Sequence, residues 1–464
     1  MAPTVLSFSA EFDPLWLISR HPECYPGILE SGSREHLGGS SPASRSAEDS
    51  RYDILPIANG EFLSLDSRAG LAGRTAEGSR GFLDALEHWC ANLPVTRPES
   101  ALDQPALPFR GGWLVYLGYE IAAEVEPLLR LPPSDDRFAA LALRAPAAWI
   151  RDRRTGQGWL IAEAGQEHLI DRFKSHTSTA QSLPPQIPMH FDLAEEDPAL
   201  FELRVRKSLD YIAAGEIYQA NLSRGWRAHG AGPVDPIAVY RRLRSSNPGP
   251  FSALLRFRDF AVMSSSPERL VMSDGQRVSS RPIAGTRPRG ADAQADAAMI
   301  RQLLDNEKER AEHVMLIDLE RNDLGRVCIG GSVEVDEFMA VETYAHVHHI
   351  VSNVTGILRP GTGIIEILRA VFPGGTITGC PKFRCMQIIA ELEGRGRGAY
   401  TGSLGYINRD GSADFNILIR TMSLNGDDLN FRAGAGIVAD SVADRELAET
   451  RAKAEGLLRA LDSR

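Results

Sequence analysis

The pattern of apolar and polar positions predicts both helices and strands in the second half of the chain. Over residues 400–438, three runs with strand composition are separated by turns rich in Asn, Asp and Gly, as in an antiparallel meander. Apolar residues recur at helical spacing over residues 297–319 and again over 442–461. A third helix is expected over residues 381–393, because proline favours the first turn of a helix and Gly394 would end it. Since no regular alternation of strands and helices runs through this part, we expect a large mixed α/β unit rather than a doubly wound sheet.

Two polar stretches divide the chain. Residues 31–50 are rich in Ser and Gly and lack an apolar period, which indicates a long surface loop. Residues 175–189 are polar and contain proline, as in a connection between domains. We therefore expect an N-terminal domain over residues 1–180 and a C-terminal domain over residues 190–464.

The composition is that of an ordinary folded protein, and the net charge limits the classes of ligand that the protein is expected to bind. Of 464 residues, 43% are hydrophobic and 24% are charged, which argues against a disordered, collagen-like or coiled-coil chain. Asp and Glu number 61 against 51 Lys and Arg, so the net charge is −10 and binding to nucleic acid is not expected. An anionic substrate would need a metal ion or a few well-placed Arg and Lys side chains.

The cysteine pattern and the hydropathy indicate a cytoplasmic protein. The 5 cysteines are widely spaced and form no Cys-x-x-Cys motif, which is typical of a reducing compartment. The first residues lack a basic segment before an apolar run, so no secretory signal is expected. The sequence holds no run of about 18 apolar residues, so no membrane-spanning helix is expected.

Four glutamates form the first group of candidate ligands. Glu309 and Glu312 lie three residues apart in one predicted helix, and Glu446 and Glu449 have the same spacing in the last one. This spacing places both members of each pair on one helix face. If the two faces meet, four carboxylates would share one pocket, which would require a cation such as Mg²⁺. The alternative is two solvated faces with ordinary surface ion pairs.

The segment FPGGTITGCPK at residues 372–382 is a candidate anion site. Its glycine-rich turn leads into the N-terminus of a predicted helix, where backbone N–H groups favour an anion, and Lys382 adds a positive charge. Cys380 and Pro381 stand where a nucleotide-binding loop would have Lys and Ser or Thr, so we expect a carboxylate rather than a nucleotide. A connection that binds no ligand is the alternative.

Three further segments carry candidate chemistry. Glu268 follows a predicted strand, and partial burial would raise its pKa toward that of a general acid; a salt-bridge partner is the alternative.

In HVHH, strand alternation places His346 and His348 on one face and His349 on the other. Two histidines on one face are too few convergent ligands for a zinc ion. One of these histidines is expected to handle a proton or a charge; a packed histidine is the alternative. Arg420 lies between apolar neighbours of a predicted strand and suits the binding of a carboxylate.

Together these segments resemble the chorismate-utilising enzymes, the family of anthranilate synthase component I and aminodeoxychorismate synthase component I. The resemblance covers most of residues 200–455 and includes GEIYQANLS, SSSPERLV, RPIAGTRPRG, EKERAEHVMLIDLERNDLGR, YAHVHHIVS, FPGGTITGCPK, GSLGYI, IRT, AGAGIVADS and the closing Glu-x-x-Glu. In the N-terminal part, LESGS, RYDIL and PFRGGWLVYLGYE are similar to segments of the same family. The resemblance implies an α+β fold, a large sandwich of antiparallel sheets flanked by helices.

The resemblance implies a magnesium site and a substrate. Glu312 and Glu449 would bind Mg²⁺ directly, and Glu309 and Glu446 would bind it through water. The metal ion would hold the ring carboxylate of chorismate, which is a dianion.

The second carboxylate of chorismate, on its enolpyruvyl group, would be held by a different set of residues. The resemblance assigns this role to Arg420 and to the backbone around Gly434 and Gly436, with help from Tyr400.

The remaining candidates would carry the chemical step. Glu268 would protonate the departing C4 hydroxyl, His349 would stabilise charge nearby, and Thr286 and Thr376 would line the pocket. Isochorismate and salicylate synthases carry a Lys that activates water at the position of Gln219, whose amide cannot act as a base. The resemblance therefore implies ammonia as the nucleophile. Because the chain lacks the Gly-x-Cys-x-Gly segment of a glutaminase, ammonia would come from a glutamine amidotransferase subunit or from solution.

The choice between the two ammonia-using synthases depends on a few segments. YQANLS, NPGPFSALL and DFNILIRT resemble the aminodeoxychorismate synthases, which serve p-aminobenzoate and folate synthesis. Ala284 is instead typical of anthranilate synthases, since many aminodeoxychorismate synthases carry there a Lys that attacks the ring. We expect component I of an aminodeoxychorismate synthase. The alternatives are component I of an anthranilate synthase, inhibited by tryptophan at LESGS, and a chorismate-binding regulatory protein without catalysis.

Overall fold

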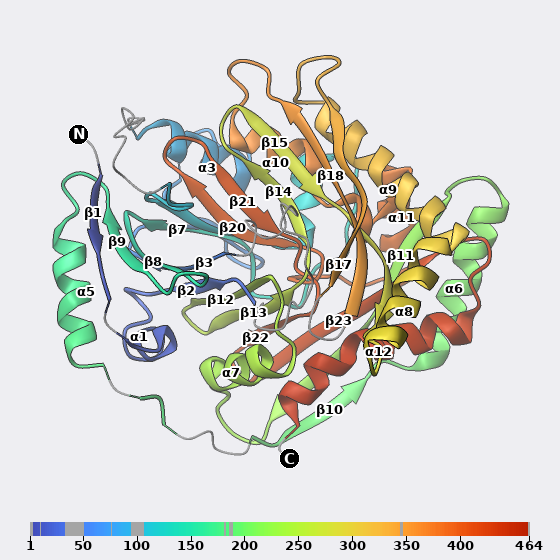
Figure 1. Ribbon diagram of the computed structural model, residues 1–464, viewed down its shortest axis with the longest axis horizontal. Coiled ribbons are helices and arrows are strands. Elements are labelled where there is room, and N and C mark those ends of the chain that lie inside the picture. The colour runs from blue at the N-terminus through green and yellow to red at the C-terminus, as the bar shows by residue number, and fades with distance from the viewer. Residues whose placement is uncertain are drawn as a thin grey trace.

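The fold is a sandwich of two large antiparallel sheets with helices on their outer faces (Figure 1). The predicted α+β sandwich flanked by helices is therefore confirmed. The computed structural model describes residues 3–9, 11–32, 51–75, 77–93, 106–180, 182–184, 189–343 and 347–462. Of the loop predicted over residues 31–50, all but the first two residues lie outside these ranges.

The first sheet has 12 strands in the described part of the chain, and all of its pairings are antiparallel. In spatial order they are β1 (Thr4–Ser7), β9 (Gly158–Ala162), β8 (Ala147–Asp152), β3 (Tyr52–Ile57), β2 (Gly27–Glu30), β12 (Phe251–Phe257), β13 (Phe260–Ser266), β22 (Thr421–Asn425), β23 (Asp428–Ile437), β11 (Gln219–Gly230) and β10 (Phe191–Glu195). The short strand β19 (Gly379–Cys380) pairs with β11 outside this order.

The second sheet has 11 strands among the described residues. In spatial order they are β16 (Ile283–Pro288), β18 (Val347–Ile357), β15 (Arg277–Arg281), β14 (Arg269–Ser273), β21 (Ala413–Asn416), β20 (Ser403–Asn408), β6 (Gly112–Leu117), β7 (Phe138–Ala145), β4 (Phe62–Asp66) and β5 (Gly70–Gly73). Strand β17 (Glu334–Thr343) pairs with β18.

The helices surround this sandwich. They are α1 (Pro14–Arg20), α3 (Phe82–Ala91), α4 (Ala122–Val125), α5 (His168–Ser178), α6 (Pro198–Ala213), α7 (Pro236–Ser246), α8 (Ala293–Asp305), α9 (Glu307–Gly325), α10 (Ile364–Val371), α11 (Lys382–Glu393) and α12 (Ala443–Leu461), with short 3₁₀ turns η1 (Tyr119–Ile121) and η2 (Gly375–Ile377). None of the helices within these ranges is long and apolar enough to cross a membrane.

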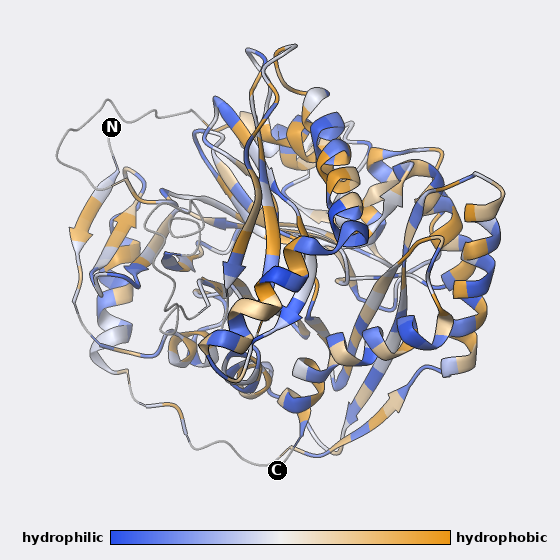
Figure 2. Cartoon of the chain, turned by 45° about the vertical axis from the view of Figure 1, so that its right-hand side comes forward, coloured by the Kyte–Doolittle hydropathy of each residue, from blue (hydrophilic) through white to orange (hydrophobic). Residues whose placement is uncertain are grey.

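Apolar side chains fill three layers. Between the sheets, Phe260 of β13 packs on Phe138 of β7, with ring centroids 5.7 Å apart. Helices α1, α5, α7 and α12 cover the outer face of the first sheet, and α3, α9 and α10 cover that of the second. Figure 2 shows hydrophobic residues following the strands through the middle of the molecule. Each sheet thus buries apolar residues on both of its faces.

The boundary predicted near residues 180–190 does not separate two independent sheets. In the first sheet β2 pairs with β12, and in the second β6 pairs with β20. Each of these pairs joins a strand from before the boundary to one from beyond it. Both sheets therefore take strands from the two sides of the predicted connection.

The meander predicted over residues 400–438 is divided between the two sheets. Strands β20 and β21 belong to the second sheet, and β22 and β23 to the first. The second of the three predicted runs, DFNILIRTMSL at residues 414–424, was expected as one strand, and this prediction is wrong. The chain passes from one sheet to the other at Ile417–Arg420, and Arg420 has the left-handed backbone angle φ 51°. Hydrogen bonds from the Ile417 amide to the Glu268 carbonyl (3.0 Å) and from the Leu418 amide to the Gly402 carbonyl (2.8 Å) hold this crossing.

The helix predicted over residues 297–319 is two helices, α8 and α9. Asn306 separates them with a non-helical ψ of 103°, and its side chain accepts the Glu309 amide N–H at 3.1 Å. An Asn in this position ends one helix and caps the next. The predicted helices over 381–393 and 442–461 are confirmed as α11 and α12, and Gly394 ends α11 in the left-handed region with φ 61°.

Candidate active site

The candidate site lies over strands β11 and β23, where two glycines of β23 form a bare surface. A Cβ atom at Gly434 would lie 2.6 Å from the Tyr400 hydroxyl, and one at Gly436 would lie 2.4 Å from the Gln219 amide nitrogen. The Asn221 Oδ1 atom also faces Gly434, and it is buried without a partner among the described residues. Both glycines are therefore required by the close approach of polar groups, as expected of a pocket floor.

Glu312 of α9 and Glu449 of α12 come together over this floor. Gln219 donates a hydrogen bond from its amide to Glu312 at 2.8 Å, and Lys453 pairs with Glu449 at 2.7 Å. Lys453 also donates to the Gly434 carbonyl at 3.0 Å. Burial raises the pKa of Glu312, and the negative charge of Glu449 adds to this rise while Gln219 and Lys453 oppose it. The two helix faces that carry these residues therefore meet.

The other two predicted metal ligands have separate surroundings. Glu309 pairs with Arg287 at 2.7 Å, and its second oxygen is buried without a partner in the described part of the chain. Burial raises the pKa of Glu446, Ser441 opposes this rise, and the charge of Glu449 increases it. Glu446 and Glu449 thus interact, whereas the Glu309 carboxylate is held by Arg287.

The four carboxylates fit Mg²⁺ in chemistry. Oxygen atoms from carboxylates are the ligands that this ion prefers, and Glu309 keeps one buried oxygen without a partner. Among the described residues, however, no three His, Cys, Asp or Glu side chains converge closely enough to hold a metal ion. Gln219, Lys453 and Arg287 each bind one of these carboxylates instead.

Glu268 lies between β13 and β14, with a side chain that is 5% exposed. Burial raises its pKa to about 8, the charge of Glu320 contributes, and the Ile283 amide, 3.5 Å away, and Lys453 oppose the rise. The hydroxyl of Thr376 also opposes it, although this buried oxygen has no well-formed hydrogen bond to any described residue. A carboxyl group that keeps its proton at neutral pH can act as a general acid.

His349 and Arg420 are two further candidate residues, and the charge of Arg420 acts on His349. His349 Nδ1 lies 3.0 Å from the Thr286 hydroxyl and 3.3 Å from the Gly285 carbonyl. Burial lowers the pKa of His349 to about 3, and the charge of Arg420 contributes, so the ring is neutral. Burial also lowers the pKa of Arg420, whose guanidinium has no partner within the described ranges. An unpaired, largely buried guanidinium favours the binding of an anion.

Lys382 does not face this site. Its ammonium pairs with Asp323 of α9 and donates to the Val371 carbonyl at 3.3 Å. The charge that Lys382 was expected to offer an external carboxylate is thus paired with Asp323 of the protein itself. The segment still borders the site, because Cys380 pairs with Gln219 through β19.

The other histidines of HVHH are arranged differently. His348 lies on the opposite face of β18 from His349, as strand alternation predicts, and its Nε2 lies 2.8 Å from Asp296 of α8. His346 lies outside the described residues. His349 is therefore the member of this group that borders the site.

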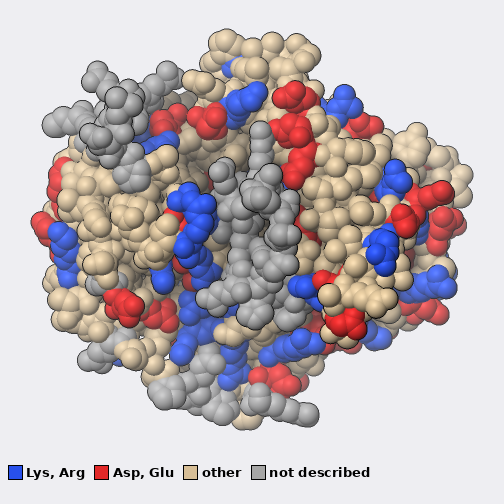
Figure 3. Space-filling view, viewed as in Figure 1, with Lys and Arg blue, Asp and Glu red and all other residues tan. Residues whose placement is uncertain are grey.

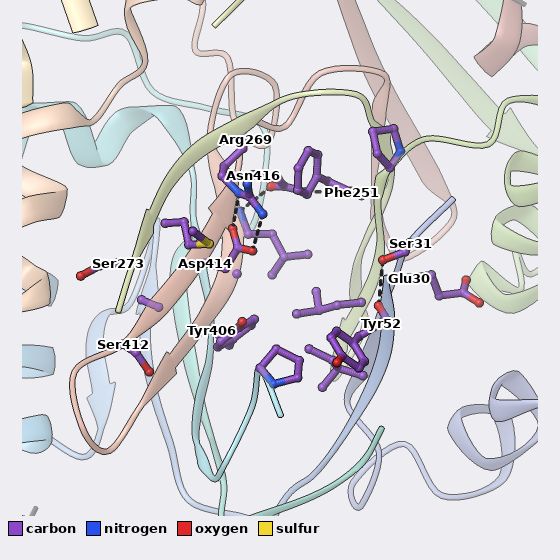
Figure 4. A pocket seen from close by; sticks show the side chains of 18 of the residues that line it. Glu30, Ser31, Tyr52, Phe251, Arg269, Ser273, Tyr406, Ser412, Asp414 and Asn416 are labelled. Atoms are coloured by element: carbon purple, nitrogen blue, oxygen red, sulfur yellow. Dashed lines mark hydrogen bonds and ion pairs between the residues drawn. The ribbon is translucent and has the colours of Figure 1, made fainter. Parts of the chain in front are cut away.

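A cavity of about 290 Å³ lies between the sheets near the predicted LESGS segment (Figure 4). Ser31 lines one side and donates a hydrogen bond to the Tyr52 carbonyl at 2.9 Å. On the other side, Arg269 binds Asp414 through two contacts of 2.9 Å and lies over the Phe251 ring. Arg269 directly follows Glu268 in the chain, so this cavity lies one residue away from the candidate general acid.

On the face in Figure 3, acidic and basic side chains are interspersed. With an overall charge of −10, attraction of a dicarboxylate depends on the cations placed inside the site.

These features define a class of protein. The chain belongs to the family described as chorismate binding enzyme, whose sequence model matches residues 67–459. It is thus a chorismate-utilising enzyme, as its motifs predicted.

Individual relatives carry two different names. The chain is 50% identical to anthranilate synthase component 1 of Thermus thermophilus, over 76% of this chain and 78% of that protein. It is 41% identical to aminodeoxychorismate synthase component 1 of Bacillus subtilis, over 82% of each. Among solved structures, anthranilate synthase component I from Streptococcus pneumoniae matches with a TM-score of 0.76 and 31% identity, over 92% of this chain and 94% of that one.

Three residues of the site were not predicted. Lys453 lies one helical turn after Glu449, a spacing that signals an ion pair in the sequence. Arg287 follows Thr286 in RPIAGTRPRG and binds Glu309. Glu320 reaches Glu268 through the fold alone, since 52 residues separate them and no sequence spacing relates the two.

Proposed function

We propose that this protein is component I of an aminodeoxychorismate synthase, which replaces the C4 hydroxyl of chorismate with an amino group from ammonia. The observation that carries the proposal is the combination of a protonated Glu268 with an unpaired Arg420 in one site. The first can supply the proton with which the hydroxyl leaves as water, and the second can hold a carboxylate.

Mg²⁺ would hold the ring carboxylate. Glu312 and Glu449 would be its direct ligands, with Glu309 and Glu446 behind water molecules. When bound, the ion would neutralise the acidic pair and orient the substrate carboxylate. Lys453 would then give up its contact with Glu449 and keep its contact with the Gly434 carbonyl.

The substrate would lie between the carboxylates and Arg420. Arg420 and the backbone at Gly434 and Gly436 would bind the enolpyruvyl carboxylate, and the Tyr400 hydroxyl would contribute a hydrogen bond. The neutral His349, oriented by Thr286, would stabilise developing charge with its other ring nitrogen. Glu268 would donate its proton to the C4 oxygen as the C4–O bond breaks.

The nucleophile is proposed to be ammonia. Gln219 has an amide, which cannot accept a proton from water, and it is already bound to Glu312. Ammonia carries its own nucleophilic lone pair and requires no such base. We propose a separate glutamine amidotransferase subunit as its source.

A direct experiment follows chorismate with Mg²⁺ and ammonium. The proposal predicts aminodeoxychorismate without release of pyruvate. Fluorescent anthranilate together with pyruvate would contradict it. Glu268→Gln should bind chorismate and lower turnover by about 10²- to 10⁴-fold, whereas a binding protein would show no turnover in either form.

A second candidate function is that of anthranilate synthase component I. Ala284 and the cavity beside Ser31 favour it, together with the 50% identity to the Thermus thermophilus protein. Under this alternative, tryptophan would inhibit by binding beside Ser31, and Ser31→Leu would remove the inhibition while sparing turnover. Chorismate turnover that yields no anthranilate and is insensitive to tryptophan would exclude this alternative.

A further inference from the structure

A buried acidic cluster lies behind Glu268, outside the proposed substrate contacts. Glu320 and Asp323 lie one turn apart on α9, and both side chains are buried. Lys382, at the start of α11, pairs with Asp323. The cluster therefore holds two carboxyl groups and one ammonium, and it lies against an apolar core that includes Leu270 and Ile377.

The turn Gly375–Thr376 joins this cluster to Glu268. Glu320 approaches Gly375 so closely that a Cβ atom there would lie 3.2 Å from its Oε1. Thr376, the next residue, faces the Glu268 carboxyl. Two buried carboxyl groups thus lie on either side of a single peptide turn, which is held against α9.

Electrostatics couple the two carboxyl groups. The negative charge of Glu320 raises the pKa of Glu268. Burial raises the pKa of Glu320 itself, with Asp323 adding to the rise and Lys382, Ser280 and the Gly375 amide opposing it. The Lys382 ammonium thus favours a charge on Glu320 inside an apolar region, and this charge disfavours ionisation of Glu268.

We propose that Glu320 is a positioning residue for the general acid: its carboxylate, which lies beside Gly375 and the Asp323–Lys382 pair, keeps the proton on Glu268 that the departing hydroxyl requires. This inference rests on the proposed role of Glu268. The glycine-rich segment 372–382 thereby gains a function, since it carries the contacts that hold the acidic cluster in place.

The pH profile of Glu320→Gln tests the inference. The charge of Lys453 also acts on Glu268, in the opposite direction, and this variant leaves it unchanged. The alkaline fall of kcat/KM for chorismate should move to lower pH by about one unit, because a neutral amide replaces the neighbouring charge. If kcat/KM falls at the same alkaline pH in Glu320→Gln as in the wild type, the inference is overturned. A purely structural role of Glu320 would change the level of activity but not the pH at which it falls.

Ser280→Ala provides a milder second variant, which keeps the test decisive if Glu320→Gln does not fold. Loss of the Ser280 hydroxyl makes the charge on Glu320 less favourable, so the limb should move in the same direction by a smaller amount. An unchanged or upward-shifted limb would contradict the inference. Glu163→Gln is the matched control, a buried carboxylate that binds Arg144 and Arg409 away from the site; its profile should match the wild type.

An infrared titration separates this inference from the proposed function. The carbonyl stretch of the protonated Glu268 carboxyl is assigned by its loss in Glu268→Gln, without any substrate. This band should disappear at a lower pH in Glu320→Gln than in the wild type, and the same midpoint in both would refute the inference. Failure of the wild type to aminate chorismate would count against the proposed function and leave this titration unaffected.

Discussion

The Gln219 side-chain amide donates a hydrogen bond to the Glu312 carboxylate across 2.8 Å, joining β11 to α9 at the centre of the site. In Gln219→Lys, the new ammonium should pair with Glu312 and compete with Mg²⁺. We expect ammonium-dependent turnover to fall by about 10-fold or more. Steady-state kinetics at saturating ammonium measure this turnover, and Gln276→Lys, at an exposed position, is the control. Wild-type turnover in Gln219→Lys would show that the contact between Gln219 and Glu312 does not matter for activity.

Magnesium affinity should depend on the inner carboxylates. Glu449→Gln removes one of the two proposed direct ligands and should weaken Mg²⁺ binding by about 10- to 100-fold. Isothermal titration calorimetry of the purified protein measures this. Glu455→Gln lies on the same helix, where Glu455 is paired with Arg459 at the surface, and should bind Mg²⁺ like the wild type. If Glu449→Gln and Glu455→Gln bound Mg²⁺ with equal affinity, Glu449 of α12 would not be a ligand of the metal ion.

Arg420 should contribute to binding and reduce stability. Its partly buried guanidinium has no partner among the described residues, so Arg420→Met should raise the free energy of unfolding by about 1–3 kcal/mol. The same variant should raise the KM for chorismate by about 100-fold, the loss expected when a charge-assisted pair worth about 3 kcal/mol is removed. Denaturant titration and steady-state kinetics measure the two effects.

Arg432→Met is the matched control for this prediction. Arg432 is also buried, but it pairs with Glu393 at 3.0 Å, so its loss leaves that carboxylate without one of its cations. We expect a destabilisation of about 3–5 kcal/mol. If Arg420→Met destabilised the protein to the same extent, Arg420 would have an internal partner in solution.

Activity should fall at alkaline pH through one titrating group. The pKa of Glu268 is raised to about 8 by burial, so kcat/KM should decrease above that pH as the acid loses its proton. His349 has a pKa of about 3 and stays neutral over the working range. A profile that is flat well above pH 8 would show that Glu268 is not the acid.

The same shift affects stability. Because the pKa of Glu268 is higher in the folded state than in the unfolded one, its contribution is full below the unfolded value and is lost as pH rises through about 8. Glu268→Gln removes this dependence. The stability of the variant relative to wild type should therefore increase between acidic pH and pH 8, as denaturant titrations at several pH values would show; a constant difference would contradict the raised pKa.

Much of the architecture could be predicted where local chemistry is strong. Helix α11 was placed correctly because Pro381 and Gly394 mark its ends. The break between α8 and α9 was missed, although Asn306 followed three residues later by Glu309 is a capping signal in the sequence itself. The continuous apolar pattern across the break concealed this signal.

Other features depend on contacts that no local pattern contains. Lys382 carries a charge suited to an external anion, but Asp323, which lies 59 residues earlier, is its partner. The crossing at Arg420 lies within an apolar run that reads as one strand, and its direction depends on hydrogen bonds to the strand ends around Glu268 and Gly402. The candidate site residues were proposed from their motifs, while their mutual contacts, such as that of Gln219 with Glu312, required the fold.

The position of nitrogen in the product tests the central claim most directly. Chorismate and ¹⁵N-ammonium are incubated with the protein and Mg²⁺, and the product is examined by NMR. The account predicts ¹⁵N bonded to C4 of a ring that retains its enolpyruvyl group. Nitrogen at C2 of an aromatic ring, with one pyruvate released per turnover, would contradict it.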